Sequence, residues 1–142
     1  MPRFAPFGYN RITLAITIPG VGYLISTSQA NVAVSKTLGF AAELEKMDVV
    51  TTTVGVGAGG SRVLNVRKGS ATGTLCGTAT IAVATQGTLG VVNAGTITTA
   101  AGANKFLDSD TLTVEFATGG TTYSAGGLEL LLTFRVRNQN AY

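Results

Sequence analysis

The chain has 142 residues, of which 45% are hydrophobic and only 12% charged, with a formal net charge of +3. This length suits one domain with a real core, and so small an excess of cations does not call for a nucleic-acid partner. No segment has the pattern of a signal peptide or is apolar enough to span a membrane, so we expect neither export nor a membrane partner. The single cysteine, Cys76, allows no internal disulfide and fits assembly in a reducing cytoplasm.

The first ten residues, MPRFAPFGYN, contain three aromatic side chains outside any alternating pattern, and two prolines favour an extended backbone. Exposed aromatic rings are costly in water. We therefore expect this arm (residues 1–10) to insert into a neighbouring subunit, or else to cover an edge of its own domain. With the short polar tail (residues 138–142), it supplies the predicted partner interface: Arg3, Phe4, Phe7, Tyr9, Arg11 and Tyr142.

Alternation with a period of two residues dominates the segment that follows the arm and predicts strands. In RITLAITI (11–18), four aliphatic residues share one face. A second run, VGYLIS, reaches Ser26, and TSQANVAVSK (27–36) is predicted as a loop or an edge strand. KTLGFAAELEKM (36–47) is predicted as a strand with a bulge near Lys46, where the alternation slips; the alternative is a helical turn.

Six further strand-like runs follow, separated by glycine-rich and polar turns. They are MDVVTTTV, RVLNVRK, TLCGTATIAVA, TLGVVNAGTIT, TLTVEFA and GLELLLTFRVR. About eight or nine strands with such spacing predict an all-β fold, an antiparallel β-sandwich that is jelly-roll-like and occupies residues 11–137. We assign the side chains of Cys76, Phe40, Phe106, Phe116 and Phe134 to the interior of this sandwich.

The segment VGVGAGGSR contains Gly55-x-Gly57-x-x-Gly60, the letter pattern of a dinucleotide-binding loop. That loop requires a following helix and an acidic residue about 20 positions later. Here a strand pattern follows, and no carboxylate occurs from Val49 to Leu107. We therefore interpret the segment as a glycine-rich hairpin connection and expect no cofactor.

Candidate catalytic and metal-binding groups are few. The chain has no histidine, so the usual nucleophile–base pairs cannot form, and we expect no enzymatic activity. Glu43, Glu45 and Asp48 are close in sequence but need not converge on a strand, so we expect no metal site. The Asp108-Ser-Asp110 pair is interpreted as loop chemistry at the start of a strand, with a weak cation site as the alternative.

Between Asp48 and Asp108 the charged residues are all cations: Arg62, Arg67, Lys68 and Lys105. We interpret this span as a neutral sheet with a few solvated cations; an acidic partner surface is the alternative. Sugar binding needs aromatic platforms, and the chain has no tryptophan. Tyr23, Tyr123 and Tyr142 are scattered candidates. The low charge and the neutral threonine and alanine faces also predict self-association, as a dimer or trimer.

From GFAAELEKMDVV through DTLTVEF and GGTTYSAGG to LELLLTFRVR, roughly residues 38–137 resemble small β-sandwich virion proteins of tailed bacteriophages. The resemblance implies a capsid decoration or cement protein. Such a protein is made in the host cytoplasm, binds the major capsid protein on the outer capsid surface and has no active-site residues to transfer. A head-fibre base or tail-associated protein is the alternative within viruses, and a carbohydrate-binding β-sandwich module is the alternative outside them.

Overall fold

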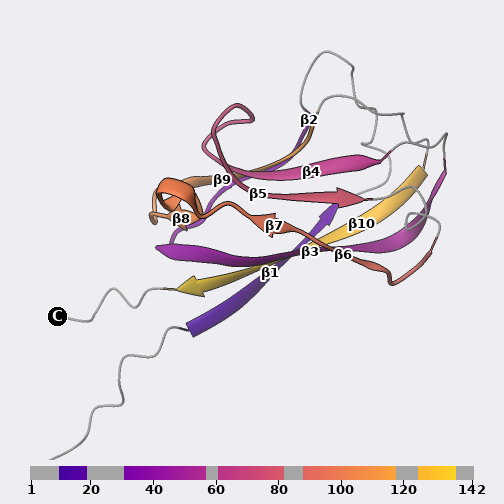
Figure 1. Ribbon diagram of the computed structural model, residues 1–142, viewed down its shortest axis with the longest axis horizontal. Helices are drawn as coiled ribbons and strands as arrows, with labels where there is room; N and C mark the ends of the chain where they lie inside the picture. The colour runs from indigo at the N-terminus through magenta and orange to yellow at the C-terminus, as the bar shows by residue number, and fades with distance from the viewer. Residues whose placement is uncertain (1–9, 19–30, 57–60, 82–87, 118–124, 137–142) are drawn as a thin grey trace, which may run out of the picture.

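The computed structural model describes residues 10–18, 31–56, 61–81, 88–117 and 125–136, which form strands joined by turns (Figure 1). The strands are β1 (Asn10–Ile18), β2 (Asn31–Thr37), β3 (Ala42–Val56), β4 (Arg62–Lys68), β5 (Thr74–Ile81), β6 (Val92–Ala94), β7 (Thr96–Ile97), β8 (Lys105–Phe106), β9 (Thr111–Phe116) and β10 (Ala125–Val136). The helical part of this description is one short 3-10 turn, Ala100–Gly102. The prediction of an all-β chain is confirmed.

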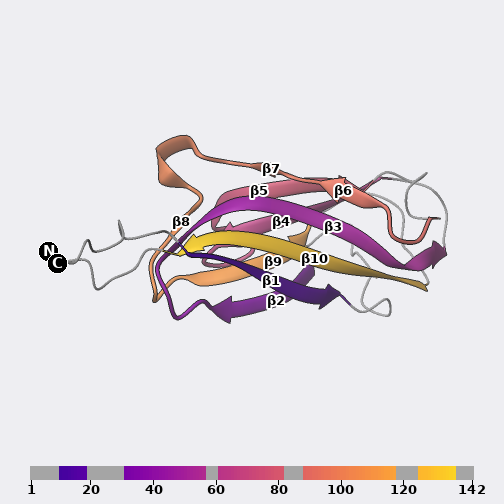
Figure 2. The same ribbon diagram turned by 90° about the horizontal axis from the view of Figure 1, so that it is seen from below.

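The strands form two antiparallel sheets packed face to face (Figure 2). In the first sheet the order is β1-β10-β3-β6, with β8 also paired to β3; in the second it is β2-β9-β4-β5-β7. The pairings are nested, since β1 pairs with β10, β2 with β9, β3 with β8 and β4 with β5. This is a long hairpin folded across itself, so the β-sandwich is a jelly roll, as predicted.

Alternation along each strand places one set of side chains between the sheets. In β10, Leu128, Leu130, Leu132 and Phe134 are buried in the core, as the pattern predicted. Phe134 makes edge-to-face contacts with Phe106 and Phe40, at centroid distances of 5.8 and 6.3 Å. The four predicted core phenylalanines therefore all contribute: three are buried, and the half-buried Phe40 packs against them.

The segment 36–47 contains no helix. It is not the single strand predicted, because Lys36 and Thr37 end β2 in the second sheet and, after a turn at Gly39, residues 42–47 begin β3 in the first sheet. Local alternation does not show that the chain changes sheets here. The predicted bulge is confirmed. The register with β10 shifts between Thr133, opposite Lys46, and Phe134, opposite Leu44, which leaves Glu45 as the extra residue. Residues 31–36 belong to β2, an edge strand, so the edge-strand reading of TSQANVAVSK is the correct one there. The predicted run VGYLIS lies outside the described residues.

Two predicted connections differ from the structure. The glycine-rich segment after β3 is not a hairpin, because β3 lies in the first sheet and the following β4 in the second, so the chain crosses between sheets there. The single strand predicted for TLGVVNAGTIT is instead divided at Gly95 into β6, which pairs with β3, and β7, which pairs with β5. Local alternation could not reveal either change, because it does not identify the sheet to which a strand belongs.

Candidate functional site

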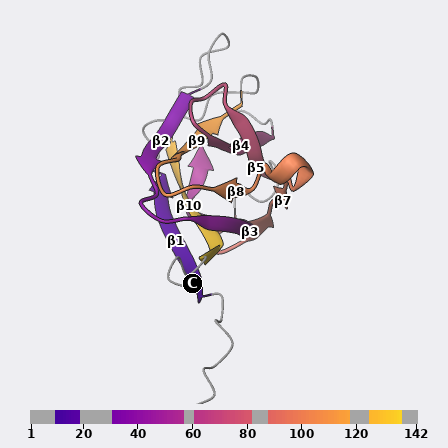
Figure 3. The same cartoon turned by 90° about the vertical axis from the view of Figure 1, so that its left-hand side faces the viewer.

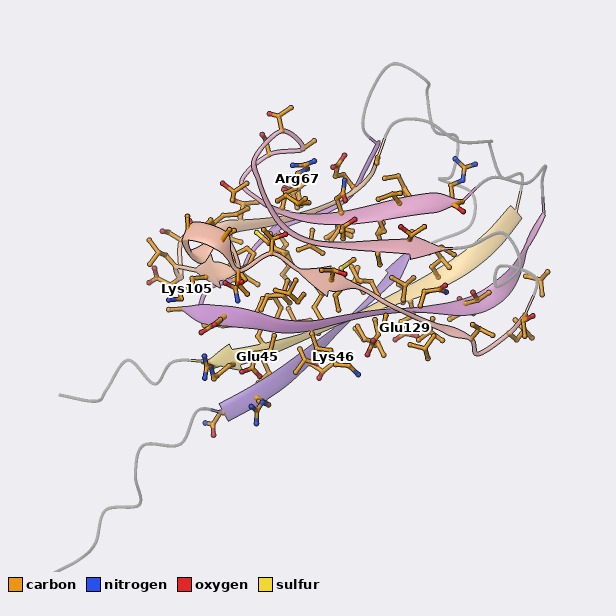
Figure 4. All side chains as sticks on the ribbon, in the orientation of Figure 1. Glu45, Lys46, Arg67, Lys105 and Glu129 are labelled. Atoms are coloured by element: carbon orange, nitrogen blue, oxygen red, sulfur yellow. The ribbon has the colours of Figure 1, made fainter. Side chains whose placement is uncertain are left out.

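Two arginines and two glutamates form an ionic network on the outward face of the first sheet, near the start of β1. Arg11 Nε lies 2.7 Å from Glu45 Oε2. Arg135 Nη2 lies 2.6 Å from Glu43 Oε2, and its Nε is 3.3 Å from Glu45 Oε1. The hydrogen bond from Arg135 holds the pKa of the Glu43 carboxyl below its usual range, so Glu43 stays ionised at neutral pH. Figure 4 labels Glu45 and Lys46 on the first half of β3, where this network lies.

Of the six predicted interface residues, Arg11 is the one within the described residues. Its guanidinium is exposed but already paired with a carboxylate of its own chain. Arg3, Phe4, Phe7, Tyr9 and Tyr142 lie outside the described residues, so the interface remains a prediction. The strands begin at Asn10 and end at Val136, one residue earlier than each predicted boundary of the domain.

The acidic residues considered as metal ligands are bound to cations instead. Glu43 and Glu45 join the arginine network, and Lys46 Nζ lies 2.6 Å from Asp48 Oδ2. Asp110 accepts a hydrogen bond from the Leu107 amide at 2.8 Å, which confirms its role in the loop before β9. Within the described ranges, no group of three or more potential ligand residues is close enough to hold a metal ion.

Cys76 lies in β5 with its side chain buried between the sheets. Desolvation is the main cause that raises the pKa of its thiol to about 11, so the thiol is protonated at neutral pH. A protonated, buried thiol is a poor nucleophile. The prediction of a small buried residue is confirmed.

A second polar cluster, which was not apparent from the sequence, lies on the outward side of the second sheet. The Glu115 side chain in β9 is only 2% exposed, yet its Oε1 accepts hydrogen bonds from Asn65 Nδ2 at 2.9 Å and Arg67 Nε at 2.6 Å. Arg67 Nη1 also donates to the Gly73 carbonyl at 2.9 Å, and the Thr113 hydroxyl donates to the carbonyl of Gly69. We call these residues the Glu115 cluster; they attach the β4–β5 turn to β9.

The Glu115 cluster corrects the interpretation of the basic span as solvated. Arg67, labelled in Figure 4, is engaged inside the chain, and Arg62 is buried. Lys68 Nζ donates to the Lys105 carbonyl at 2.8 Å and lies 5.8 Å from the Phe106 ring centroid. Arg62 and Arg67 are therefore not solvated as expected, whereas the Lys105 side chain is exposed. The cluster is too buried to receive a ligand and acts in the fold.

The described part of the chain has no exposed aromatic ring. The phenylalanines belong to the core or pack against it, and the candidates Tyr23, Tyr123 and Tyr142 lie outside the described residues. A groove of about 200 Å³ does open between β1 and β2, lined mainly by apolar side chains such as Leu14, Ile16, Val34 and Phe40, with Lys36 at its rim. The aromatic ring in this lining, Phe40, is half-buried against Phe134, and the described residues that line the groove include no carboxylate.

The opposite side of the sandwich presents a neutral strand edge (Figure 3). β6 is the last strand of the first sheet and β7 the last strand of the second. Large apolar side chains are exposed beside them: Val92 is 55% and Leu89 61% exposed. The sequence did contain a signal for this surface, the absence of charge from Gly69 to Asn104, but alternation does not show which side of the sandwich that stretch occupies.

Comparisons with known proteins do not identify a family or a function for this chain. Neither a known protein family nor a curated protein matches the chain. A solved structure of CsCBM6-3 from Clostridium stercorarium, in complex with cellobiose, is similar over 93% of this chain and 84% of that one, with a TM-score of 0.38 and 16% identity. At so low a TM-score, the likeness does not bear on what this chain binds. No helix in the described ranges is long and apolar enough to cross a membrane.

Proposed function

We propose that this chain is a non-enzymatic virion structural protein, a decoration or cement protein that binds the major capsid protein on the outer surface of a tailed-phage capsid. The observation that carries the proposal is the neutral side of the jelly roll. A stretch without charge, from Gly69 to Asn104, supplies β5, β6 and β7 and exposes Leu89 and Val92. Such a surface suits close contact with other protein and offers no reactive group.

One further observation supports contact in preference to chemistry. Four carboxylates, those of Glu43, Glu45, Asp48 and Glu115, form ion pairs with cations of the same chain. The jelly roll itself occurs both in viral capsid proteins and in lectins, so the fold alone does not decide between shell binding and sugar binding.

A decoration protein stabilises a shell because it binds the assembled lattice and not the free subunits. At a free concentration 100 times its dissociation constant, each site stabilises the bound state by about 2.7 kcal/mol. The expected effect is therefore a shell that resists heat better as sites fill and stops gaining stability once they are full.

The deciding measurement is the copy number of this chain on purified particles, by quantitative mass spectrometry against the major capsid protein. We expect a number comparable to that of the shell subunits. A few copies per particle would instead indicate a head-fibre base or a tail-associated protein. Absence from the particles, together with specific binding in a glycan array, would overturn the proposal in favour of a carbohydrate-binding module.

A further inference from the structure

The segment from Leu89 to Ile97 forms one side of the sandwich and contributes an edge to both sheets. β6 pairs with β3 through Asp48–Ala94, Val49–Asn93 and Val50–Val92, and β7 pairs with β5 through Thr78–Thr96 and Gly77–Ile97. In the part of the chain that the structure describes, no strand pairs with the outer edge of β6. This edge is therefore a place where another strand can be added.

The hydrogen bonds of this segment show which backbone groups face outward. The Gly90 amide donates to the Thr51 carbonyl at 2.9 Å, the Thr51 amide to the Val91 carbonyl at 3.2 Å, and the Gly95 amide to the Met47 carbonyl at 2.7 Å. Successive residues of a strand direct their backbone groups to opposite edges. Val92 and Ala94 therefore direct their amide and carbonyl groups away from β3, toward the outer edge.

The side chains of β6 itself carry no charge, and the charged residue paired with this strand, Asp48 opposite Ala94, forms an ion pair with Lys46. Val92 is 55% exposed and lies directly opposite Val50 on the outward face of the first sheet. Val54 and Leu89 are also exposed, at 40% and 61%. The edges at β1, β2 and β8 differ, because β1 carries Arg11, β2 carries Lys36 and β8 carries Lys105. The edge strand β7 of the second sheet is uncharged like β6, but it has only two residues. Charged residues such as lysine are a common protection of an edge strand against pairing, and β6 lacks it.

We propose that the outer edge of β6 pairs with the same edge of a second copy of this chain. The two β6 strands run antiparallel about a two-fold axis, with Val92 of each copy opposite Ala94 of the other. A two-fold contact places the same surface on both sides, so a charge close to the axis would lie near its own copy. A neutral edge with outward backbone donors and acceptors is therefore complementary to itself. Because the β6 edge is then paired in both copies, the assembly stops at a dimer. The proposal does not depend on capsid binding.

The test introduces a charge at the centre of the proposed contact and compares it with a matched site elsewhere. We expect the full chain to show a concentration-dependent dimer in sedimentation velocity. Val92→Lys should be monomeric at concentrations where the unmodified chain is dimeric. Leu107→Lys is the control, because Leu107 is similarly exposed, at 64%, but lies in the turn between β8 and β9. That variant should dimerise like the unmodified chain.

A second pair of measurements examines the symmetry and the backbone contacts. Val92→Glu should also be monomeric by itself, whereas an equal mixture of Val92→Lys and Val92→Glu should form dimers, because the two side chains approach each other diagonally across the axis. Hydrogen exchange should show the Val92 and Ala94 amides becoming protected as the concentration of the unmodified chain rises. Should Val92→Lys lower the melting temperature, Ala94→Lys provides the same charge at the neighbouring outward position.

A chain that stays monomeric at every concentration would overturn the proposal. So would equal loss of dimer in Leu107→Lys, or an equal mixture of Val92→Lys and Val92→Glu that remains monomeric. Dimers that form while the Val92 and Ala94 amides stay unprotected would also contradict it, since they would use another surface.

Discussion

Two glutamates of this chain bind arginine in different surroundings. Glu115 is buried, and it accepts hydrogen bonds from both Asn65 and Arg67. Glu45 lies on the outward face of the first sheet, where its partner Arg11 is exposed to solvent. A buried pair that loses one charge leaves the other without compensation, whereas an exposed pair is screened by water. The environment, and not the pairing itself, should decide how much each glutamate stabilises the fold.

We therefore predict that Glu115→Gln lowers the free energy of unfolding by about 1.5–3 kcal/mol, the range for hydrogen bonds to charged groups. The matched variant Glu45→Gln should lower it by about 0–1 kcal/mol, as for other exposed pairs. Urea unfolding followed by circular dichroism measures both. Equal losses in the two variants would show that the Glu115 cluster contributes no more than a surface ion pair.

At the level of the strands, the division of the 92–97 segment into β6 and β7 depends on Gly95. A Cβ at this position would lie 2.9 Å from Met47 Cγ, 3.0 Å from Met47 Sδ and 3.0 Å from the Thr78 carbonyl oxygen. Met47 belongs to the first sheet and Thr78 to the second, so Gly95 lies where the chain passes from one to the other. The absence of a side chain is what allows this passage.

Gly95→Ala should accordingly destabilise the domain by about 1–3 kcal/mol, the usual cost of overpacking a tight site. Gly77→Ala is the graded control, because its closest contact would be 3.3 Å, to the flexible end of the Ile97 side chain. We expect a clearly smaller loss there, measured as the shift of the urea midpoint at constant slope. A larger loss in Gly77→Ala than in Gly95→Ala would contradict this explanation of the strand division.

At the scale of the whole molecule, the N-terminal arm is predicted to contact a neighbouring subunit; its residues 1–9 lie outside the described ranges. We predict that deleting residues 1–9 weakens attachment to the shell or to other copies while the domain keeps its melting temperature, because the strands begin at Asn10. Burying one aromatic ring contributes about 1.5–3 kcal/mol, against about 0–1 kcal/mol for an exposed arginine pair. Phe4→Ala should thus weaken attachment more than Arg3→Ala.

Particle binding and differential scanning calorimetry of the truncated chain distinguish the two roles of the arm. A truncated domain that melts much earlier and still binds its partners would place the arm on its own fold. The truncated chain retains all of β1, from Asn10 to Ile18, and with it the pairing of this strand with β10.

Much of the fold could be predicted from the sequence because a strand with one buried face must alternate. The faces of β1 and β10, the bulge in β3, the loop role of Asp110 and the burial of Cys76 all follow from patterns within about ten residues of each other. The candidate contact surface could be predicted only in part. The sequence shows that residues 69–104 carry no charge, but it does not show that this stretch forms a strand edge.

The sequence by itself determined an all-β chain with few charges, no histidine and a hydrophobic face on each long strand, because these properties belong to single residues and their neighbours. Only the tertiary structure decided that β3 and β4 lie in different sheets, that β6 and β7 divide at Gly95, and that Arg67 meets Glu115. Those two side chains are 48 positions apart, and Arg135 and Glu43 are 92 apart. Tertiary packing determines which of these distant side chains come into contact. A local pattern shows to which face of a strand a side chain points, but not which residue it contacts.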